Sequence, residues 1–337
     1  MINVELKGGA VKEFENGTTP AEIAKSIGAG LYKSVCCAKV DGDLCDLRTP
    51  LEKDCKVELL TFDNVDGQKT FWHTASHVLA QAVKRLYPNA KCAIGPAVDN
   101  GFYYDFDVEK PFSPEDLEKI KAEMKKIVKS GLELERVELS PEEAEKKLEE
   151  MNEPYKVELV KEHSDKGEHI TFYKQGEFID LCAGPHLMSV APIKAIELTA
   201  CTGAYWRGDA NNAQLCRVYG VAFPKASMLE EHLKKLEEAK LRDHNKLGRE
   251  LEYFTTVDYV GQGLPILLPK GARVVQLLQR WVEDVEQSKG CLLTKTPLLA
   301  KRDLYKISGH WDHYLDGMFV LGDPHDEEKE CFALRPM

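Results

Sequence analysis

The sequence lacks an apolar run long enough to cross a membrane, and it lacks a secretory leader. It also lacks an excess of basic residues, because 45 Lys and Arg stand against 56 Asp and Glu, for a formal net charge of −11. This balance argues against a basic nucleic-acid surface over the whole chain, but not against a local one. The 10 cysteines show no small-domain disulfide spacing, so we expect reduced thiols in a cytoplasmic protein.

The sequence does contain enough residues for several folded domains, because its length is 337 residues and 43% of them are hydrophobic. A capping box over residues 19–22, with Pro20 at the first helical position, predicts a helix that ends near Gly28. Short apolar runs before and after it predict strands. This order predicts a ubiquitin-like β-grasp domain over residues 1–62, followed by a polar linker at 63–68.

The next stretch predicts a helix that carries two histidines. Apolar residues recur at helical spacing at Ala75, Val78, Leu79, Ala82, Val83 and Leu86. His73 and His77 fall one turn apart on the opposite face, where both imidazoles can act on one water or one metal ion. On their own, these two residues would more simply be solvated surface histidines.

A second short segment supplies a cysteine and a third histidine. In Asp180–His186, which reads DLCAGPH, Gly184 and Pro185 exclude a helix and place Cys182 and His186 on a tight loop. Three histidines and a cysteine in two short segments are the donor types of a metal site or a hydrolytic site.

The remaining pattern predicts a mixed α+β fold. Helices are expected from Ser113 to Ser130 and after Ser140, because each begins at a serine cap followed by proline. The strands of a single sheet are expected at 156–160, 170–173, 178–181, 196–199 and 217–223. These elements define a second domain over residues 63–224, and a strongly charged stretch predicts a connecting helix over 225–243.

Residues 244–337 predict a further, incomplete domain. We expect strands at 251–255, 266–268, 291–297 and 332–337. An amphipathic helix is expected at 271–288, with its apolar residues facing inward. The chain ends as the last strand begins.

These elements and motifs, in this order, resemble bacterial threonyl-tRNA synthetases along the whole chain. Residues 1–62 are similar to the TGS domain of that family, and His73 to His77 with Cys182 to His186 are similar to the HxxxH and CxxxH motifs of its editing domain. Further similar segments are AIGP from Ala93, DNGFYYD from Asp99, GAYWRGD from Gly203, SGHWDHY from Ser308 and FALRPM from Phe332. The helix at 271–288 and the strand after it resemble class II motif 1.

The resemblance implies an editing site that hydrolyses Ser-tRNA(Thr). It carries His73, His77, Cys182 and His186 over as site residues, and it adds Lys156, Asp180 and Tyr104. In these roles Lys156 carries charge toward the ester, Asp180 holds the seryl ammonium and Tyr104 lines the pocket. Without the resemblance, Lys156 would be an ordinary surface lysine at a strand edge.

The family also sets the expected cofactors and partners. Ligand chemistry alone would let His73, His77, Cys182 and His186 hold zinc. Threonyl editing domains resemble the zinc-binding alanyl ones but work without a metal, so we expect water in the cavity. The complete synthetase is expected to use ATP, Mg²⁺ and one Zn²⁺, to bind tRNA(Thr) and threonine, and to form a homodimer through motif 1.

In this family the zinc ligands, motifs 2 and 3 with their ATP-binding arginines, and the anticodon-binding domain all lie beyond the position of Met337. The resemblance therefore implies a ligase fragment that is truncated within its catalytic domain and retains only editing hydrolysis. Two other hypotheses stay open, an editing-only deacylase and a non-catalytic RNA-binding or regulatory module.

Overall fold

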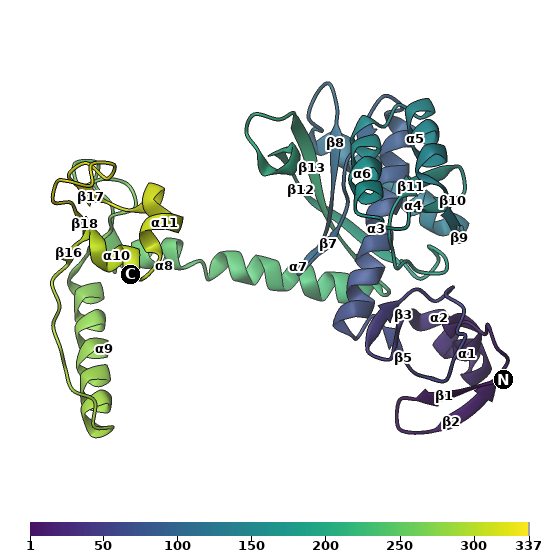
Figure 1. Cartoon of the computed structure of the whole chain (residues 1–337), viewed down its shortest axis with the longest axis horizontal. Helices are drawn as coiled ribbons and strands as arrows, with labels where there is room; N and C mark the ends of the chain where they lie inside the picture. The colour runs from purple at the N-terminus through teal and green to yellow at the C-terminus, as the bar shows by residue number, and fades with distance from the viewer. Residues whose placement is uncertain (336–337) are drawn as a thin grey trace. The chain divides into compact units, whose positions relative to one another are not determined.

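The computed structural model describes residues 1–335, which form two compact units that meet between residues 239 and 240. Figure 1 shows the whole chain, coloured from the N-terminus to the C-terminus. The fold is α+β, as the sequence predicts. In the part of the chain that the structure describes, no helix is both long and apolar enough to span a membrane.

The first unit begins with a small sheet and two short helices. The strands are β1 (Ile2–Leu6), β2 (Val11–Phe14), β3 (Val35–Val40), β4 (Asp43–Cys45) and β5 (Cys55–Thr61), in the order β2-β1-β5-β3-β4. Helices α1 (Pro20–Ile27) and α2 (Ala29–Ser34) lie between β2 and β3, and the predicted Thr19–Glu22 capping box starts α1. Strand β1 is parallel to β5, as a β-grasp requires.

Helix α3 (Val65–Leu86) begins three residues after β5, so the prediction of a polar linker at 63–68 is wrong for residues 65–68, which are helical. The helix runs close to the preceding strand, because a Cβ at Gly67 would lie only 2.0 Å from the carbonyl oxygen of Thr61. Glycine therefore allows α3 to start directly beside β5.

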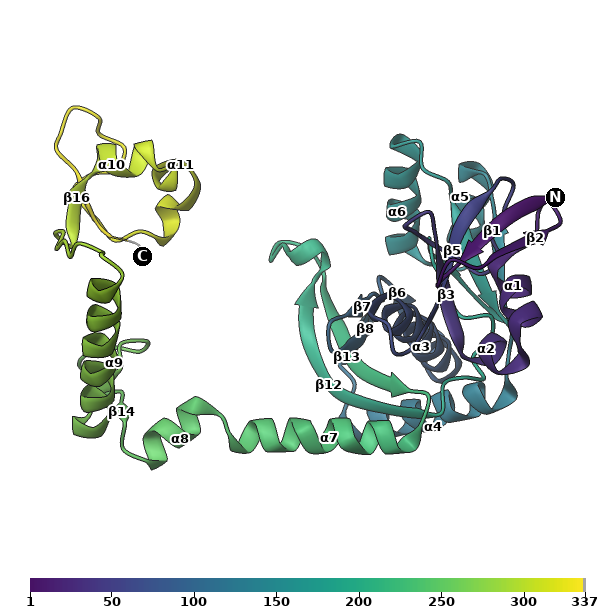
Figure 2. The same ribbon diagram turned by 90° about the horizontal axis from the view of Figure 1, so that it is seen from below.

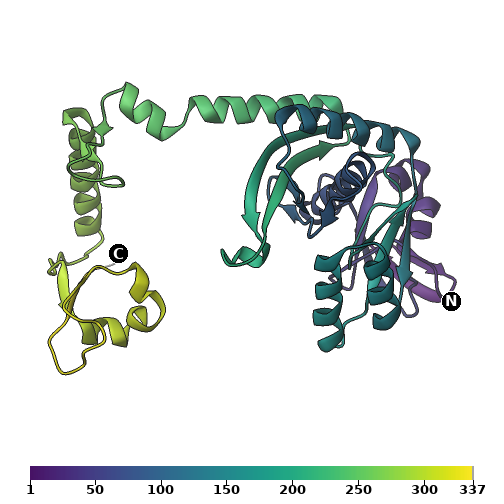
Figure 3. The ribbon, with the colours of Figure 1, turned by 90° about the horizontal axis from the view of Figure 1, so that it is seen from above.

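Helix α3 lies against a five-stranded sheet. Its strands are β6 (Lys91–Cys92), β7 (Ala97–Val98), β8 (Gly101–Asp107), β12 (Ala195–Tyr205) and β13 (Gln214–Phe223). The long strands β12 and β13 curve around α3, as seen from below in Figure 2 and from above in Figure 3. The Trp72 indole N–H donates to the Ala222 carbonyl at 2.9 Å, which ties the helix to β13. Helix α4 (Pro114–Ser130) packs on α3 and β12, and α7 (Ala226–Leu241) follows β13.

A separate three-stranded sheet is formed by β9 (Leu134–Glu138), β10 (Thr171–Gln175) and β11 (Phe178–Leu181) in the order β11-β10-β9. The prediction of one continuous sheet is therefore wrong, because β10 pairs with β9 and not with β12 or β13. Helices α5 (Pro141–Glu150) and α6 (Pro154–Asp165) pack against each other in this region.

Residues 156–160, predicted as a strand, lie within α6. Pro154 occupies the first turn of the helix, where its missing N–H costs nothing. The apolar residues of this segment are buried on two faces of the helix: Val157 and Val160 belong to the cluster of Phe172, and Leu159 to that of Trp206. In the sequence, apolar residues that belong to two faces resemble the alternating pattern of a strand.

The second unit contains α8 (His244–Glu250), β14 (Phe254–Thr255), β15 (Ile266–Leu267), α9 (Pro269–Ser288), β16 (Leu299–Lys301), α10 (Arg302–Ile307), α11 (His310–Tyr314), β17 (Val320–Leu321) and β18 (Phe332–Leu334). The strand predicted at 291–297 is absent; the residues form no regular element. The apolar face of α9 was expected to be buried, yet Trp281 is 63% exposed and Leu278 is 55% exposed in the unit as described.

Candidate active site

The middle of helix α3 presents two histidines to a common cavity. His73 and His77 lie one turn apart, with ring centroids separated by 5.4 Å. His77 is only 2% exposed, so it is not the solvated surface histidine of the simplest interpretation. The buried neighbours Val78, Leu79 and Val83 hold the other side of the helix in the core.

The loop after β11 brings Cys182 and His186 to the same place. This turn requires glycine at position 184 for two reasons. The φ angle of Gly184 is +78°, which disfavours other residues, and a Cβ there would lie only 2.3 Å from the hydroxyl oxygen of Tyr173. The Cys182 Sγ atom lies 3.3 Å from His73 Nε2 and 3.2 Å from His186 Nε2. The four donor atoms of His73, His77, Cys182 and His186 all lie within 4.8 Å of one another.

A hydrogen bond on the far side of the His186 ring fixes its tautomer. The Thr74 hydroxyl donates to the Thr70 carbonyl at 3.0 Å, so its contact with His186 Nδ1 at 3.2 Å is an N–H donated by the imidazole. The lone pair of His186 Nε2 therefore faces Cys182. His73 also interacts with the Pro185 backbone, which favours its protonated form.

Burial keeps these two imidazoles neutral. It lowers the pKa of His73 to about 4, with the charge of Asp180 opposing this effect only partly. Burial also lowers the pKa of His186 well below its ordinary value, and the neighbouring His77 and His73 add to the effect. At neutral pH each ring can accept a proton at Nε2, which is what a general base requires.

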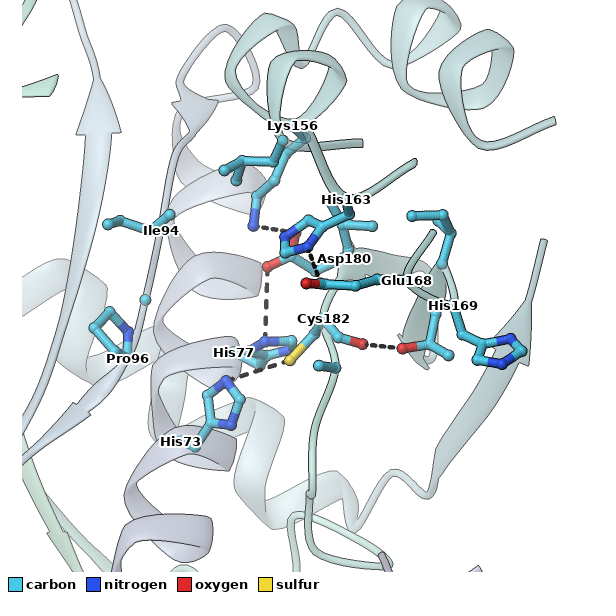
Figure 4. A pocket seen from close by; sticks show the side chains of 16 residues that line it. His73, His77, Ile94, Pro96, Lys156, His163, Glu168, His169, Asp180 and Cys182 are labelled. Atoms are coloured by element: carbon cyan, nitrogen blue, oxygen red, sulfur yellow. Dashed lines mark hydrogen bonds and ion pairs between the residues drawn. The ribbon is translucent and has the colours of Figure 1, made fainter. Parts of the chain in front are cut away.

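An ion pair lies beside the cluster. Lys156 Nζ of α6 lies 2.7 Å from Asp180 Oδ1 of β11, and both side chains are nearly inaccessible to solvent. Burial disfavours both charges, but the attraction between them raises the pKa of Lys156 and keeps that of Asp180 below its ordinary value. Figure 4 shows Lys156, His73 and His77 directed toward Asp180 and Cys182.

Tyr104 does not line the cavity, in contrast to the expectation. It is fully buried in β8, and its hydroxyl donates to Asp180 Oδ2 at 2.6 Å. Asp180 Oδ2 also lies 3.7 Å from His77 Nε2. Tyr104 therefore orients the carboxylate from behind, and Asp180 is already engaged by Lys156 and Tyr104 before a substrate binds.

The cavity has a volume of about 330 Å³ and is also bordered by residues that the sequence did not predict as site residues, although some of them belong to the AIGP and DLCAGPH segments. These are Ile94, Gly95, Pro96, Leu159, His163, Glu168, His169, Ile170, Thr171, Leu181 and Ala183. His163 Nδ1 lies 2.5 Å from Glu168 Oε2 at the mouth of the cavity (Figure 4). Leu159 and His163 lie on the charged helix α6, and Glu168 and His169 lie on the irregular connection after it, so no spacing pattern pointed to these four.

The sequence is similar to known proteins over two domains and along its whole length. Residues 2–61 match the TGS domain, and residues 170–219 match the "Threonyl and Alanyl tRNA synthetase second additional domain". Over all 337 residues the sequence is 60% identical to the threonine–tRNA ligase of Clostridium perfringens and 51% identical to that of Acetivibrio thermocellus. The chain is similar to the threonine–tRNA ligases along its whole length. It spans about half the length of these ligases, 52% in each case.

Within the ligase match, the domain model at 170–219 contains Asp180, Cys182 and His186, while His73, His77, Tyr104 and Lys156 lie before it. The site therefore combines residues from inside the matched segment with residues that precede it. The domain boundaries at 62, 224 and 243 stay predictions.

The four clustered side chains could hold a metal ion. Tetrahedral zinc, with bonds of roughly 2.1 Å to nitrogen and 2.3 Å to sulfur, separates a nitrogen and a sulfur ligand by about 3.6 Å. The two sulfur–nitrogen distances of 3.2 and 3.3 Å are close to that value. The Nδ1 atom of His77 is buried without a hydrogen-bond partner. The donor types and spacing therefore fit zinc, which would supply a Lewis acid at the cavity.

Proposed function

We propose that this chain carries the proofreading site of a threonine–tRNA ligase, which hydrolyses the ester of Ser-tRNA(Thr). The observation that carries this proposal is the cluster of His73, Cys182 and His186 beside the Lys156–Asp180 ion pair, with His73 and Cys182 lining the cavity and the fully buried His186 behind Cys182. The second support is the similarity of the chain to threonine–tRNA ligases over its whole length.

A threonine-specific enzyme needs such a site for a physical reason. Serine carries the same amine and hydroxyl as threonine and lacks only a methyl group. A missing methyl changes binding by about 1–3 kcal/mol, or roughly 10–200-fold, which is less than accurate translation needs. A second site that hydrolyses the wrong ester supplies the remaining selectivity.

The side chains of the cavity match the steps of ester hydrolysis. A water molecule in the cavity gives a proton to the neutral imidazole of His73 as it attacks the ester carbonyl. The ammonium of Lys156 provides positive charge for the oxyanion that develops on the carbonyl. The protonated imidazole, or the Cys182 thiol beside it, then returns a proton to the leaving ribose oxygen. Asp180 holds Lys156 in place.

We propose that this hydrolysis proceeds without a bound metal. In support, every step above is assigned to a side chain, and the Cys182 thiol can donate to one of the two imidazole lone pairs. If zinc does bind, His73, His77, Cys182 and His186 are the residues that would hold it.

The wider assignments follow from the relatives. We propose that the complete, cytoplasmic enzyme attaches threonine to tRNA(Thr) with ATP and Mg²⁺, and that its synthetic site uses one Zn²⁺ held outside this chain. We also propose a homodimer through α9, supported by the exposed Leu278 and Trp281 on that helix.

Deacylation of Ser-tRNA(Thr) and Thr-tRNA(Thr) by the full chain, measured side by side, tests the proofreading proposal. We expect the seryl ester to be hydrolysed at least tenfold faster than the threonyl ester. Equal rates, or rates equal to those of tRNA in buffer, would favour the non-catalytic RNA-binding module.

A further inference from the structure

The β-grasp domain reaches into the wall of the candidate active site through one turn. Asp46, Leu47 and Arg48 follow β4, and the fully buried Leu47 fixes this turn in the core of the β-grasp domain. Its two neighbours point the other way, toward the loop that carries His186. We call these three residues the Asp46–Arg48 turn.

The turn holds the backbone of the His186 loop on both sides. The His186 N–H donates to Asp46 Oδ2 at 3.2 Å. Arg48 Nη1 donates to the His186 carbonyl at 3.3 Å, and Arg48 Nη2 donates to the Leu187 carbonyl at 2.8 Å. The fourth polar group of this dipeptide, the Leu187 N–H, donates to Thr74 of α3 at 3.0 Å. Because the loop has no regular secondary structure, these bonds satisfy its buried backbone.

A side chain also connects the turn to the imidazole. The Tyr173 hydroxyl donates to Asp46 Oδ2 at 2.8 Å, and the Tyr173 ring lies 4.4 Å from the His186 ring, centroid to centroid. The same tyrosine occupies the space next to Gly184. Asp46 thus determines the position of a ring that contacts both ends of the His186 loop.

The turn is itself rigid. Asp46 Oδ1 accepts the Arg48 backbone N–H at 2.8 Å and Arg48 Nη1 at 3.0 Å. Arg48 Nε donates to the Leu134 carbonyl at 3.0 Å, at the start of β9. All three guanidinium nitrogens therefore have acceptors, and a planar fork is needed to reach them at once.

From these contacts we propose that Asp46 and Arg48 are positioning residues of the hydrolytic site. They hold the His186–Leu187 backbone so that His186 Nε2 faces Cys182. This inference rests on the proposed function, and it gives the β-grasp domain a part in hydrolysis rather than only in binding RNA. Neither residue touches the cavity, so loss of either should lower kcat without changing KM for the tRNA.

A control interaction joins the same two parts of the molecule away from the cavity. Lys39 of β3 lies 2.7 Å from Asp66 in the first turn of α3. Lys39→Met removes an ion pair between the β-grasp domain and α3 but leaves the His186 loop untouched. It reports what weakening the domain contact does by itself.

The test is steady-state deacylation of Ser-tRNA(Thr) by the full chain and its Asp46→Ala, Arg48→Met, Arg48→Lys and Lys39→Met variants, each with its thermal unfolding midpoint. We expect Asp46→Ala and Arg48→Met to lower kcat at least tenfold with KM changed less than twofold. Arg48→Lys, which keeps one charged donor, should recover part of kcat, and Lys39→Met should match the wild type.

Wild-type kcat in Asp46→Ala and Arg48→Met would overturn the inference while leaving the proposed function intact. Equal losses in Lys39→Met and in the turn variants would also overturn it, because the contact would then be merely structural. If the wild type hydrolyses no seryl ester, the proposed function fails and the inference fails with it.

Discussion

His73 Nε2 and Cys182 Sγ lie 3.3 Å apart, although 109 residues separate them in the chain. Helix α3 supplies the first and the loop after β11 supplies the second. Because burial keeps His73 neutral, its lone pair is free to accept a proton beside the thiol.

Removing the Thr74 hydroxyl should slow hydrolysis, because the proton of His186 would no longer be held on Nδ1. Thr74→Val keeps the shape of the side chain but removes the acceptor for His186 Nδ1 and for the Leu187 N–H. We expect kcat for Ser-tRNA(Thr) to fall about tenfold, with about 1–3 kcal/mol lost from the free energy of unfolding. Thr70→Val, one turn earlier on α3, serves as the control. Equal kcat in both variants would contradict the tautomer assignment.

The pH dependence should reflect the buried state of His73. Its pKa of about 4 predicts a deacylation rate that is constant from pH 7 to 5.5 and falls at lower pH. The unfolded chain takes up this proton near pH 6.5, so the His73 contribution to stability is complete above that value and is lost as pH falls toward 4. Rates and unfolding midpoints over pH 4–8 check both statements. A rate that halves above pH 6 would contradict this account.

The charges of Lys156 and Asp180 should stabilise the fold only when both are present. Lys156→Met leaves a buried carboxylate without its partner, so we expect about 3–5 kcal/mol of destabilisation in denaturant unfolding. Lys156→Met combined with Asp180→Asn removes both charges and should recover much of this stability. Neither variant should regain hydrolysis, since the ammonium is absent. A double variant as unstable as the single one would show that the charges are not coupled.

Metal content separates the two chemistries that the cluster allows. We expect the purified chain to contain less than 0.1 zinc per chain by elemental analysis, and deacylation to persist after treatment with a chelator. Stoichiometric zinc that disappears in Cys182→Ser would contradict the metal-free mechanism and assign the ion to the four-residue cluster.

Local patterns in the sequence predicted the helix of His73 and His77 and the loop of Cys182 and His186. Apolar spacing locates the first, and Gly184 and Pro185 locate the second. That these two segments lie close together in the fold could not be derived from residue types alone. The similarity to a known family supplied Lys156 and Asp180.

Long-range relationships account for what the sequence did not predict. Lys156 was assigned to a strand because α6 buries apolar residues on two faces. Tyr104 was expected at the cavity, but its place behind Asp180 depends on the register of β8. The role of the Asp46–Arg48 turn has no local signature, because Asp46 meets His186 across 140 residues of sequence.

Single-turnover deacylation of Ser-tRNA(Thr) by His186→Ala tests the hydrolytic site most directly. His244→Ala, an exposed histidine in the second unit, is the control. The account predicts that His186→Ala loses at least 100-fold in rate with an unchanged circular dichroism spectrum, and that His244→Ala matches the wild type. A His186→Ala chain that hydrolyses the seryl ester at the wild-type rate would contradict the account.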